Sequence, residues 1–205
     1  DGLSIAVHPD NDWCKSLSVA QLKKLWEPDS KIVKWSELDP SWPDQAIKLF
    51  GADTDSGTFE YFTEVVVGKK KESRTDYQQA SDDNVLIQGV AGSKYALGYI
   101  PFGYCMENKD KVKVIAISPT KDPAETAAPA VMPTNDTILS GEYAPLSRPL
   151  FVYANRDAMK RPEVAGFLKF SVSEAAQPLV TQRGFVRVTE ETRKKMEEKL
   201  SEALK

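Results

Sequence analysis

The sequence GADTDSGTF at residues 51–59 joins an apolar segment to an amphipathic one, and it decides how the rest of the chain is interpreted. Before it, residues 46–50 (AIKLF) predict a short, mostly apolar strand. After it, Phe59, Phe62 and Val66 recur at helical spacing, so we expect the turn to lie at a helix N-terminus. The first N–H groups of a helix lack partners within the helix and carry about half a positive charge. The stretch therefore predicts a site for a small anion such as phosphate, sulfate or carboxylate.

The side chains of this turn suit the same chemistry. Ser56 and Thr58 supply two hydroxyl donors, and Gly57 lets a ligand approach the backbone. An ordinary helix cap is the alternative, because Asp55 or Ser56 can accept a hydrogen bond from an unpaired N–H group in any protein. The residues alone leave both interpretations open.

Two enzymatic interpretations of the turn are disfavoured. A phosphate-binding P-loop needs a lysine before its Ser/Thr, and this stretch has none. The serine-hydrolase pattern G-x-S-x-G fails because Thr54 and Thr58 occupy the two glycine positions around Ser56. His8 is the only histidine, so it would have to be the catalytic base. A hydrolase built on Ser56 and His8 is the weakest hypothesis.

Ordered motifs along nearly the whole chain carry a family resemblance. The most specific are DSGTFEYF at residues 55–62 and DDNVLIQGV at 82–90. The others are DGLSIAVHPDND at 1–12, LSVAQLKKLWEP at 17–28, GYIPFGY at 98–104 and YAPLSRPLF at 143–151. In this order they resemble the phosphate-binding proteins of ABC phosphate-uptake systems (PstS type).

The resemblance implies an α/β, periplasmic-binding-protein-like (type II) fold with two lobes. It implies a hinge strand at residues 1–8 and a second α/β lobe, which carries the SGT turn, at 9–117. A linker at 118–145 would return the chain to the first lobe, whose C-terminal part would be residues 146–205. Family members carry a further segment before the hinge strand, and nothing here corresponds to it, so we expect one lobe to be incomplete.

The resemblance also implies a set of phosphate ligands. They are Ser56, Gly57 and Thr58, with Asp55 as an acceptor for a protonated phosphate oxygen. Some family members place an arginine four residues before the serine, where this chain has Ala52, so Arg148 becomes the candidate guanidinium. No catalytic residue, cofactor or metal is expected.

The function implied is that of a non-enzymatic receptor. It would capture inorganic phosphate between its lobes and deliver it to the permease subunits of an ABC transporter. The location implied is periplasmic or extracellular and peripheral to the membrane, with a lipid anchor in the full-length precursor. The alternatives are a truncated binding or regulatory module that pairs with another protein, and a receptor for another tetrahedral oxyanion.

Composition agrees with a globular protein and excludes some partners. The 205 residues are 41% apolar and 28% charged, and 27 basic against 30 acidic side chains give a net charge of −3. Nucleic-acid binders usually carry basic faces, so that class is disfavoured. An anion site made of neutral N–H and O–H dipoles remains compatible with a negative chain. No apolar run approaches the ~20 residues of a membrane-spanning helix, and no signal peptide is recognisable.

The two cysteines, Cys14 and Cys105, permit one disulfide or two free thiols. Export of the protein favours the bond, although sequence spacing does not establish the required Cα separation. Two cysteines and a single histidine make a structural zinc site improbable.

Strand and helix patterns alternate along the chain, as in an α/β protein. Ser18 and Gln21 predict a capping box before a helix that Pro28 ends. Trp35 and Trp42 are expected to anchor a loop at residues 29–44. Strands are predicted at 3–7, 95–104, 111–117, 147–153 and 184–188, and further helices at 57–67, 82–89, 162–172, 174–182 and 189–204.

Overall fold

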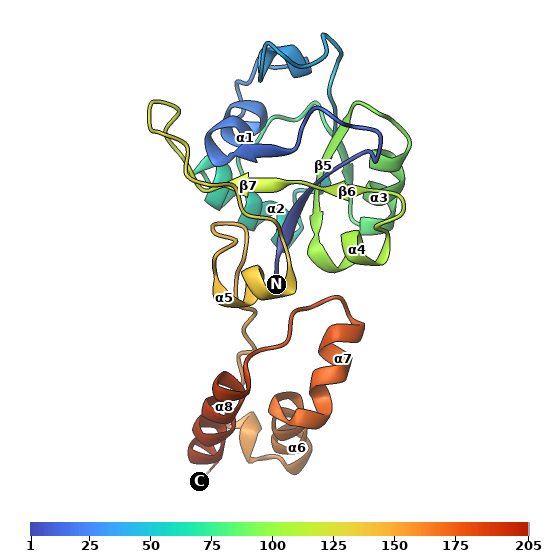
Figure 1. Ribbon diagram of the computed structural model, residues 1–205. Coiled ribbons are helices and arrows are strands. Elements are labelled where there is room, and N and C mark those ends of the chain that lie inside the picture. The colour runs from blue at the N-terminus through green and yellow to red at the C-terminus, as the bar shows by residue number, and fades with distance from the viewer. Residues whose placement is uncertain (205) are drawn as a thin grey trace. The chain divides into compact units, whose positions relative to one another are not determined.

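A five-stranded mixed sheet organises the first part of the chain (Figure 1). The computed structural model describes residues 1–204. The strands are β1 (Leu3–Val7), β2 (Ser16–Ser18), β3 (Lys48–Ala52), β4 (Gln78–Ala80), β5 (Ala96–Pro101), β6 (Lys113–Val114) and β7 (Ala116–Ser118). The order in the larger sheet is β4-β3-β5-β1-β6, and β2 pairs with β7 in a small parallel sheet. β3 is parallel to both β4 and β5, whereas β1 runs antiparallel to β5 and β6.

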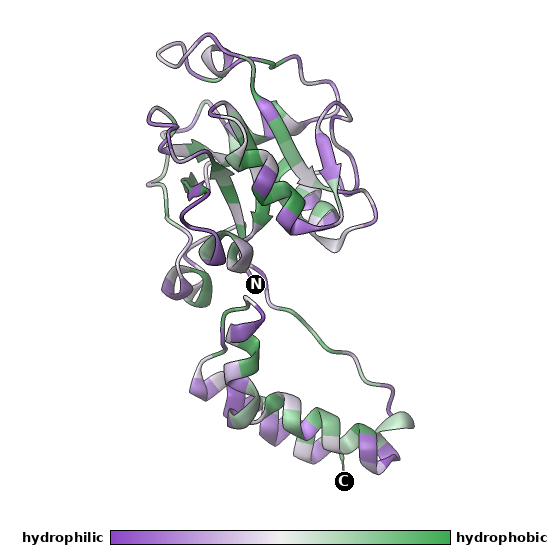
Figure 2. Cartoon of the chain, turned by 90° about the vertical axis from the view of Figure 1, so that its right-hand side faces the viewer, coloured by the Kyte–Doolittle hydropathy of each residue, from purple (hydrophilic) through white to green (hydrophobic). Residues whose placement is uncertain are grey.

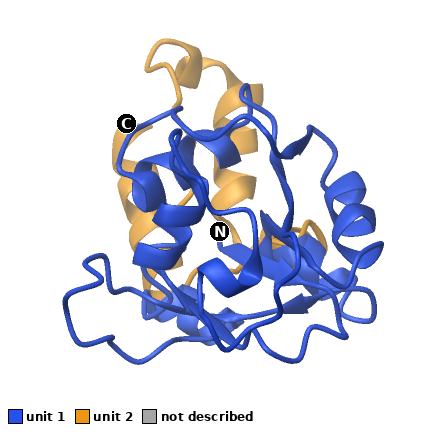
Figure 3. Ribbon diagram, turned by 90° about the horizontal axis from the view of Figure 1, so that it is seen from above, with its two compact units in different colours: residues 1–148 blue, residues 149–205 orange. Residues whose placement is uncertain are grey.

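The chain divides into two compact units, residues 1–148 and 149–205 (Figure 3). The helices of unit 1 are α1 (Val19–Trp26), η1 (Trp35–Glu37), α2 (Gly57–Phe62), η2 (Thr63–Val67), α3 (Asp83–Ala91), α4 (Phe102–Glu107) and α5 (Asn135–Ser140). The α/β class predicted from the sequence is confirmed. The lobe boundaries implied by the resemblance stay predictions.

Side chains pack on both faces of the larger sheet, and its central strands are mostly apolar (Figure 2). All five residues of β1 are buried, as expected for a strand with neighbours on both sides. On one face, Phe50 and Ile100 pack with Leu86 and Ile87 of α3. On the other face lies an aromatic cluster, which consists of Trp26, Phe62, Tyr77 and Tyr99.

The end of β3 is held against this aromatic cluster. The hydroxyls of Tyr77 and Tyr99 both donate to the Ala52 carbonyl, at 2.9 and 3.2 Å. Gly51 is required there, because a Cβ at this position would lie 2.3 Å from the Tyr99 ring. The strand predicted at residues 46–50 therefore lies two residues further on, and the glycine belongs to the strand rather than to the turn.

The helix predicted at residues 57–67 is continuous but changes its geometry. α2 gives way at Thr63 to the π-helical segment η2, which ends at Gly68 with a φ of 84°. The Thr63 hydroxyl lies 2.9 Å from the Phe59 carbonyl and accepts from the Lys71 N–H. Extra hydrogen bonds into a helix ladder are a common cause of such bulges.

Unit 2 is made of short helices, with no strand among residues 149–204. They are η3 (Ala158–Lys160), α6 (Pro162–Val172), η4 (Glu174–Ala176), α7 (Gln177–Gln182) and α8 (Glu190–Ala203). Leu168 and Ala176 are buried, and the Arg193 guanidinium is bonded to Glu190 and Glu197 along α8. The helices predicted at 162–172, 174–182 and 189–204 are confirmed to within a residue or two.

The strands predicted at residues 147–153 and 184–188 are wrong. In the first, only Ser147 forms a bridge, with Gly2, and the Arg148 N–H donates to the Asp1 carbonyl. The side chains of residues 150–153 are exposed. Apolar composition alone does not make a strand, because each strand needs a neighbour for its backbone hydrogen bonds.

Two other predicted strands differ in extent from the strands of the structure. β5 stops at Pro101, which has no N–H group to donate, and Phe102 begins α4. The strand predicted at 111–117 is divided in two, because β6 pairs with β1 whereas β7 pairs with β2. The predicted linker at 118–145 contains α5, whose N-cap is Thr134.

The favoured disulfide is wrong, because Cys14 and Cys105 are both buried, free thiols. Cys14 follows the C-terminal end of β1, and Cys105 follows the C-terminal end of β5. Since these neighbouring strands are antiparallel, their C-terminal ends point in opposite directions and lie at opposite ends of the strand pair. Burial raises the pKa of each thiol to about 12.

Candidate functional site

The candidate anion site lies at the sheet edge where the three parallel strands end. β3, β4 and β5 run in the same direction, and each is followed by a helix, namely α2, α3 and α4. Three helix N-termini therefore face one edge of the sheet. Ligands of open α/β sheets commonly bind outside the carboxyl ends of the strands.

α2 and α3 differ in how their N-termini are filled. At α3, Asp82 is the N-cap and accepts from the Asn84 N–H at 2.9 Å, and Asp83 occupies the first turn. Burial, with the neighbouring Asp82 carboxylate, raises the pKa of Asp83 to about 6. At α2 the N-cap is the neutral Ser56, whose Oγ accepts from the Thr58 N–H at 3.0 Å. The α2 terminus thus has a neutral cap, and the acidic residue of its first turn, Glu60, is paired with Lys70 and Lys71.

Donors remain unused at the start of α2. Ser56 is the helix cap, as the alternative interpretation predicted, but its hydroxyl proton is not consumed by accepting a bond. Among residues 1–204, the N–H groups of Gly57 and Phe59 have no acceptor, and neither does the Thr58 hydroxyl. An added Cβ at Gly57 would meet nothing within 4 Å, so the backbone there is open. Capping and anion binding are therefore compatible at this turn.

The structure brings Arg148 to this turn from 91 residues away in the sequence. Its guanidinium donates to the Gly57 carbonyl at 3.2 Å and lies 3.5 Å from the Asp1 carboxylate. The Nε–H of Arg148 is buried and has no partner among residues 1–204. The Asp1 carboxylate balances part of this positive charge, and the unpaired Nε–H remains available to a further anion.

Asp55 lies next to the cap and is exposed. Its carboxylate makes no hydrogen bond or ion pair within the described part of the chain. It is therefore free to accept a hydrogen bond from a protonated oxygen. All five residues predicted for the site, Asp55, Ser56, Gly57, Thr58 and Arg148, are thus adjacent in unit 1, but their role as phosphate ligands stays a prediction.

Tyr61 lies within the DSGTFEYF motif, but sequence reasoning assigned it no role. The single proton of its hydroxyl is shared between the carbonyls of Pro145 and Ser147, the latter at 2.9 Å, and the Arg148 guanidinium carbon lies 4.5 Å from the centre of its ring. Burial raises the pKa of Tyr61, against the opposing effect of Arg148. The only local signal was an aromatic residue one helical turn after Gly57, which predicts no particular partner.

The lysines of residues 69–71 are engaged in ion pairs with glutamates. Lys70 and Lys71 pair with Glu60 at 2.6 and 3.4 Å, and Lys69 pairs with Glu72 at 3.2 Å. The hydrogen bond from Lys70 lowers the pKa of Glu60. These exposed side chains form a solvated face.

The Ser56 and His8 pair needed for a hydrolase does not form. Val7 is opposite Leu97 in the sheet, and Leu49 is opposite the same residue, so His8 lies level with Lys48. Ala52, which ends β3 just before the turn, is four residues further along, or about 13 Å at ~3.3 Å per residue. His8 instead accepts a hydrogen bond from the Asp10 N–H at 3.0 Å.

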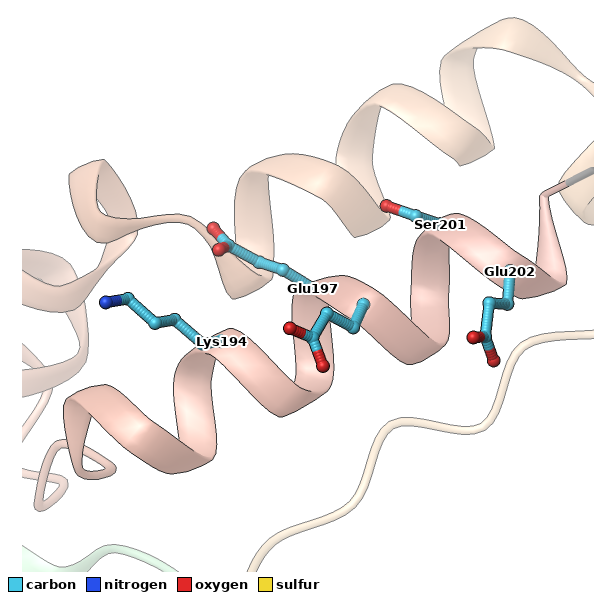
Figure 4. A pocket seen from close by; sticks show the side chains of 5 residues that line it. Lys194, Glu197, Ser201 and Glu202 are labelled. Carbon is cyan, nitrogen blue, oxygen red and sulfur yellow. The ribbon is translucent and has the colours of Figure 1, made fainter.

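A pocket of about 370 Å³, separate from the candidate anion site, is lined by side chains of α8 (Figure 4). Its lining residues are Lys194, Glu197, Glu198, Ser201 and Glu202, all in unit 2. Three carboxylates make it unsuitable for an anion. Within residues 1–204, no group of three or more His, Cys, Asp or Glu side chains is placed to hold a metal ion. No helix in that range is long and apolar enough to cross a bilayer.

Comparison with known proteins identifies the family. The sequence model of the PBP superfamily domain matches residues 1–175. Protein SphX of Synechocystis is 38% identical over 93% of this chain, and the phosphate-binding protein PstS of Staphylococcus haemolyticus is 35% identical over 95%. The chain spans 55% and 58% of the lengths of these two relatives.

A solved structure agrees with this assignment. It is that of a possible phosphate-binding protein from Planctomyces limnophilus, which matches all of this chain with 49% identity and a TM-score of 0.86. The present chain covers 70% of that protein. The chain therefore belongs to the PBP superfamily and is a relative of its PstS-type phosphate-binding proteins.

Proposed function

We propose that the chain binds inorganic phosphate at the turn formed by Ser56, Gly57 and Thr58, as part of a phosphate receptor of an ABC uptake system. The observation that carries the proposal is the approach of Arg148 to Gly57, at 3.2 Å, beside unused donors of the same turn. A guanidinium and a helix N-terminus together suit a doubly or singly charged oxyanion. The names of the relatives point to phosphate among such anions.

Each residue has a specific role in this proposal. The N–H groups of Gly57 and Phe59 and the hydroxyls of Ser56 and Thr58 donate to phosphate oxygens, and Arg148 supplies the positive charge. Asp55 accepts a hydrogen bond from a protonated phosphate oxygen. Because sulfate carries no proton at neutral pH, an unpaired Asp55 carboxylate facing it would disfavour sulfate.

The rest of the function follows from the family. Bound phosphate would be delivered to the permease subunits of an ABC transporter, with the receptor on the periplasmic or extracellular side of the membrane and lipid-anchored in its full-length form. Binding alone would serve this role, without chemical change of the ligand.

Substitution of Ser56 by alanine tests the site. The change removes a hydrogen bond to a charged ligand, worth about 1.5–3 kcal/mol, so phosphate affinity measured by calorimetry should fall about 10- to 150-fold. Ser18→Ala is the matched control, because Ser18 is also a serine N-cap but belongs to α1. Equal phosphate affinities in the two variants would contradict the assignment.

Asp55→Asn tests selectivity separately. An amide can donate a hydrogen bond to sulfate, so the preference of this variant for phosphate over sulfate should be smaller. A preference for phosphate that stays unchanged in competition titrations would remove Asp55 from the site.

A further inference from the structure

We infer that Tyr61 is a positioning residue, which holds Arg148 at the start of α2 by clamping the chain segment 145–148. The inference rests on the proposed function, since Arg148 is the phosphate-binding guanidinium of that proposal. The hydroxyl of Tyr61 bonds to the carbonyls of Pro145 and Ser147 and not to a donor of the turn. It acts on the segment that carries Arg148.

The clamp has two parts on one side chain. The single proton of the Tyr61 hydroxyl is shared between the carbonyls of Pro145 and Ser147, which lie 84 and 86 residues away in the sequence. The ring supports the Arg148 guanidinium, whose carbon lies 4.5 Å from the ring centre. A planar guanidinium stacks on an aromatic face in a way that lysine does not reproduce.

The segment held in this way is tied to the beginning of β1. The Leu3 N–H donates to the Leu146 carbonyl at 2.8 Å, and the Arg148 N–H donates to the Asp1 carbonyl at 2.9 Å. Segments 1–3 and 146–148 therefore move as a pair. Tyr61 is a side-chain link between this pair and the helix that begins with Ser-Gly-Thr.

The position of Tyr61 on α2 explains why it can make this link. It follows Gly57 by four residues, so both lie on one side of the helix. Arg148 spans that side, since it donates to the Gly57 carbonyl while resting on Tyr61. Without the ring, the long arginine side chain would regain rotamer freedom and would leave the turn for part of the time.

The first test measures phosphate affinity in a double-mutant cycle with Tyr61→Phe and Arg148→Ala. Loss of the hydroxyl bonds should weaken phosphate binding about three- to tenfold. Because Tyr61 acts through Arg148, the double variant should bind no more than about twofold more weakly than the weaker single variant. Losses that multiply, or an unchanged affinity in Tyr61→Phe, would overturn the inference.

The second test needs no ligand and separates this inference from the proposed function. Amide hydrogen exchange at Leu3 and Arg148 should be about fivefold faster in Tyr61→Phe. Exchange at Leu97, in the middle of β5, should not change. Tyr104→Phe is the matched control, because the Tyr104 hydroxyl makes no hydrogen bond within residues 1–204.

The two tests give distinguishable failures. If the unaltered chain binds no phosphate, the proposed function fails, and the exchange rates alone decide whether the clamp exists. If phosphate binds and exchange at Leu3 and Arg148 is the same in both tyrosine variants, the clamp is refuted and the proposed site stands. Faster exchange at Leu97 as well would show a general loss of stability and would also refute the positioning role.

Discussion

Units 1 and 2 differ in how they bury apolar side chains. Trp26, Trp35 and Tyr99 of unit 1 are fully buried, and side chains pack on both faces of its sheet. Among residues 149–204, the buried apolar side chains are Leu168 and Ala176, whereas Phe151 is 68% exposed. Burial of apolar surface is the main favourable contribution to folding. Unit 1 therefore supplies most of the stability, and the candidate site belongs to this stable unit.

The largest effect that tests this contrast is expected from Phe62→Ala. The Phe62 ring is fully buried and stacks on Tyr99 with centroids 4.0 Å apart. Its loss should lower the free energy of unfolding by about 3–5 kcal/mol in urea denaturation. Phe167→Ala in unit 2, where the ring is 63% exposed, should change it by less than about 0.5 kcal/mol. Similar losses in both variants would refute the difference between the units.

A smaller effect, which depends on pH, is expected from Asp83→Asn in unit 1. The pKa of Asp83 is raised from 3.8 to about 6, first by burial and then by Asp82. Because the folded-state pKa exceeds the unfolded one, the carboxyl stabilises the fold fully below about 3.8 and loses this contribution as the pH rises through about 6. The neutral asparagine avoids that loss. The free energy of unfolding of the variant, minus that of the unaltered chain, should therefore be about 1–2 kcal/mol larger at pH 8 than at pH 4.5.

Urea denaturation at the two pH values measures this difference. The expected gain is less than the full pKa shift implies, since asparagine also gives up the attraction between a carboxylate and the α3 N-terminus. Asp110→Asn, at an exposed position in unit 1, is the control. A stability difference that is the same at both pH values would contradict a raised pKa at the half-buried Asp83.

The smallest effects are expected from two equivalent helix caps, one in each unit. Ser18 and Thr189 each accept the N–H three residues later at 3.1 Å. Ser18→Ala should lower the global free energy of unfolding by about 1 kcal/mol. Thr189→Ala should mainly increase local exchange at the start of α8, because little burial couples that helix to global unfolding. Hydrogen exchange distinguishes the two, and a global loss in the Thr189 variant would indicate that unit 2 unfolds together with unit 1.

Local features were well predicted from the sequence. The Ser18 capping box and the Ser56 cap are each determined by residues within one helical turn. Their prediction requires no knowledge of the rest of the fold, and for this reason α1 and α2 begin where expected.

Features that need distant partners were predicted poorly. The apolar residues 147–153 have the composition of a strand, but only Ser147 finds a bridging partner. The disulfide between Cys14 and Cys105 was favoured because export is expected, without knowledge that β1 and β5 are antiparallel. Arg148 entered the candidate site through the family resemblance rather than through spacing, and Tyr61 was missed because its partners lie more than 80 residues away.

Isothermal titration of the chain with phosphate, and with sulfate as the control anion, tests the central claim most directly. We expect a saturable heat of binding for phosphate, with one site per chain and clearly weaker binding of sulfate. Absence of phosphate binding, or equal affinity for the two anions, would contradict the claim that the Ser56 turn and Arg148 form a phosphate site.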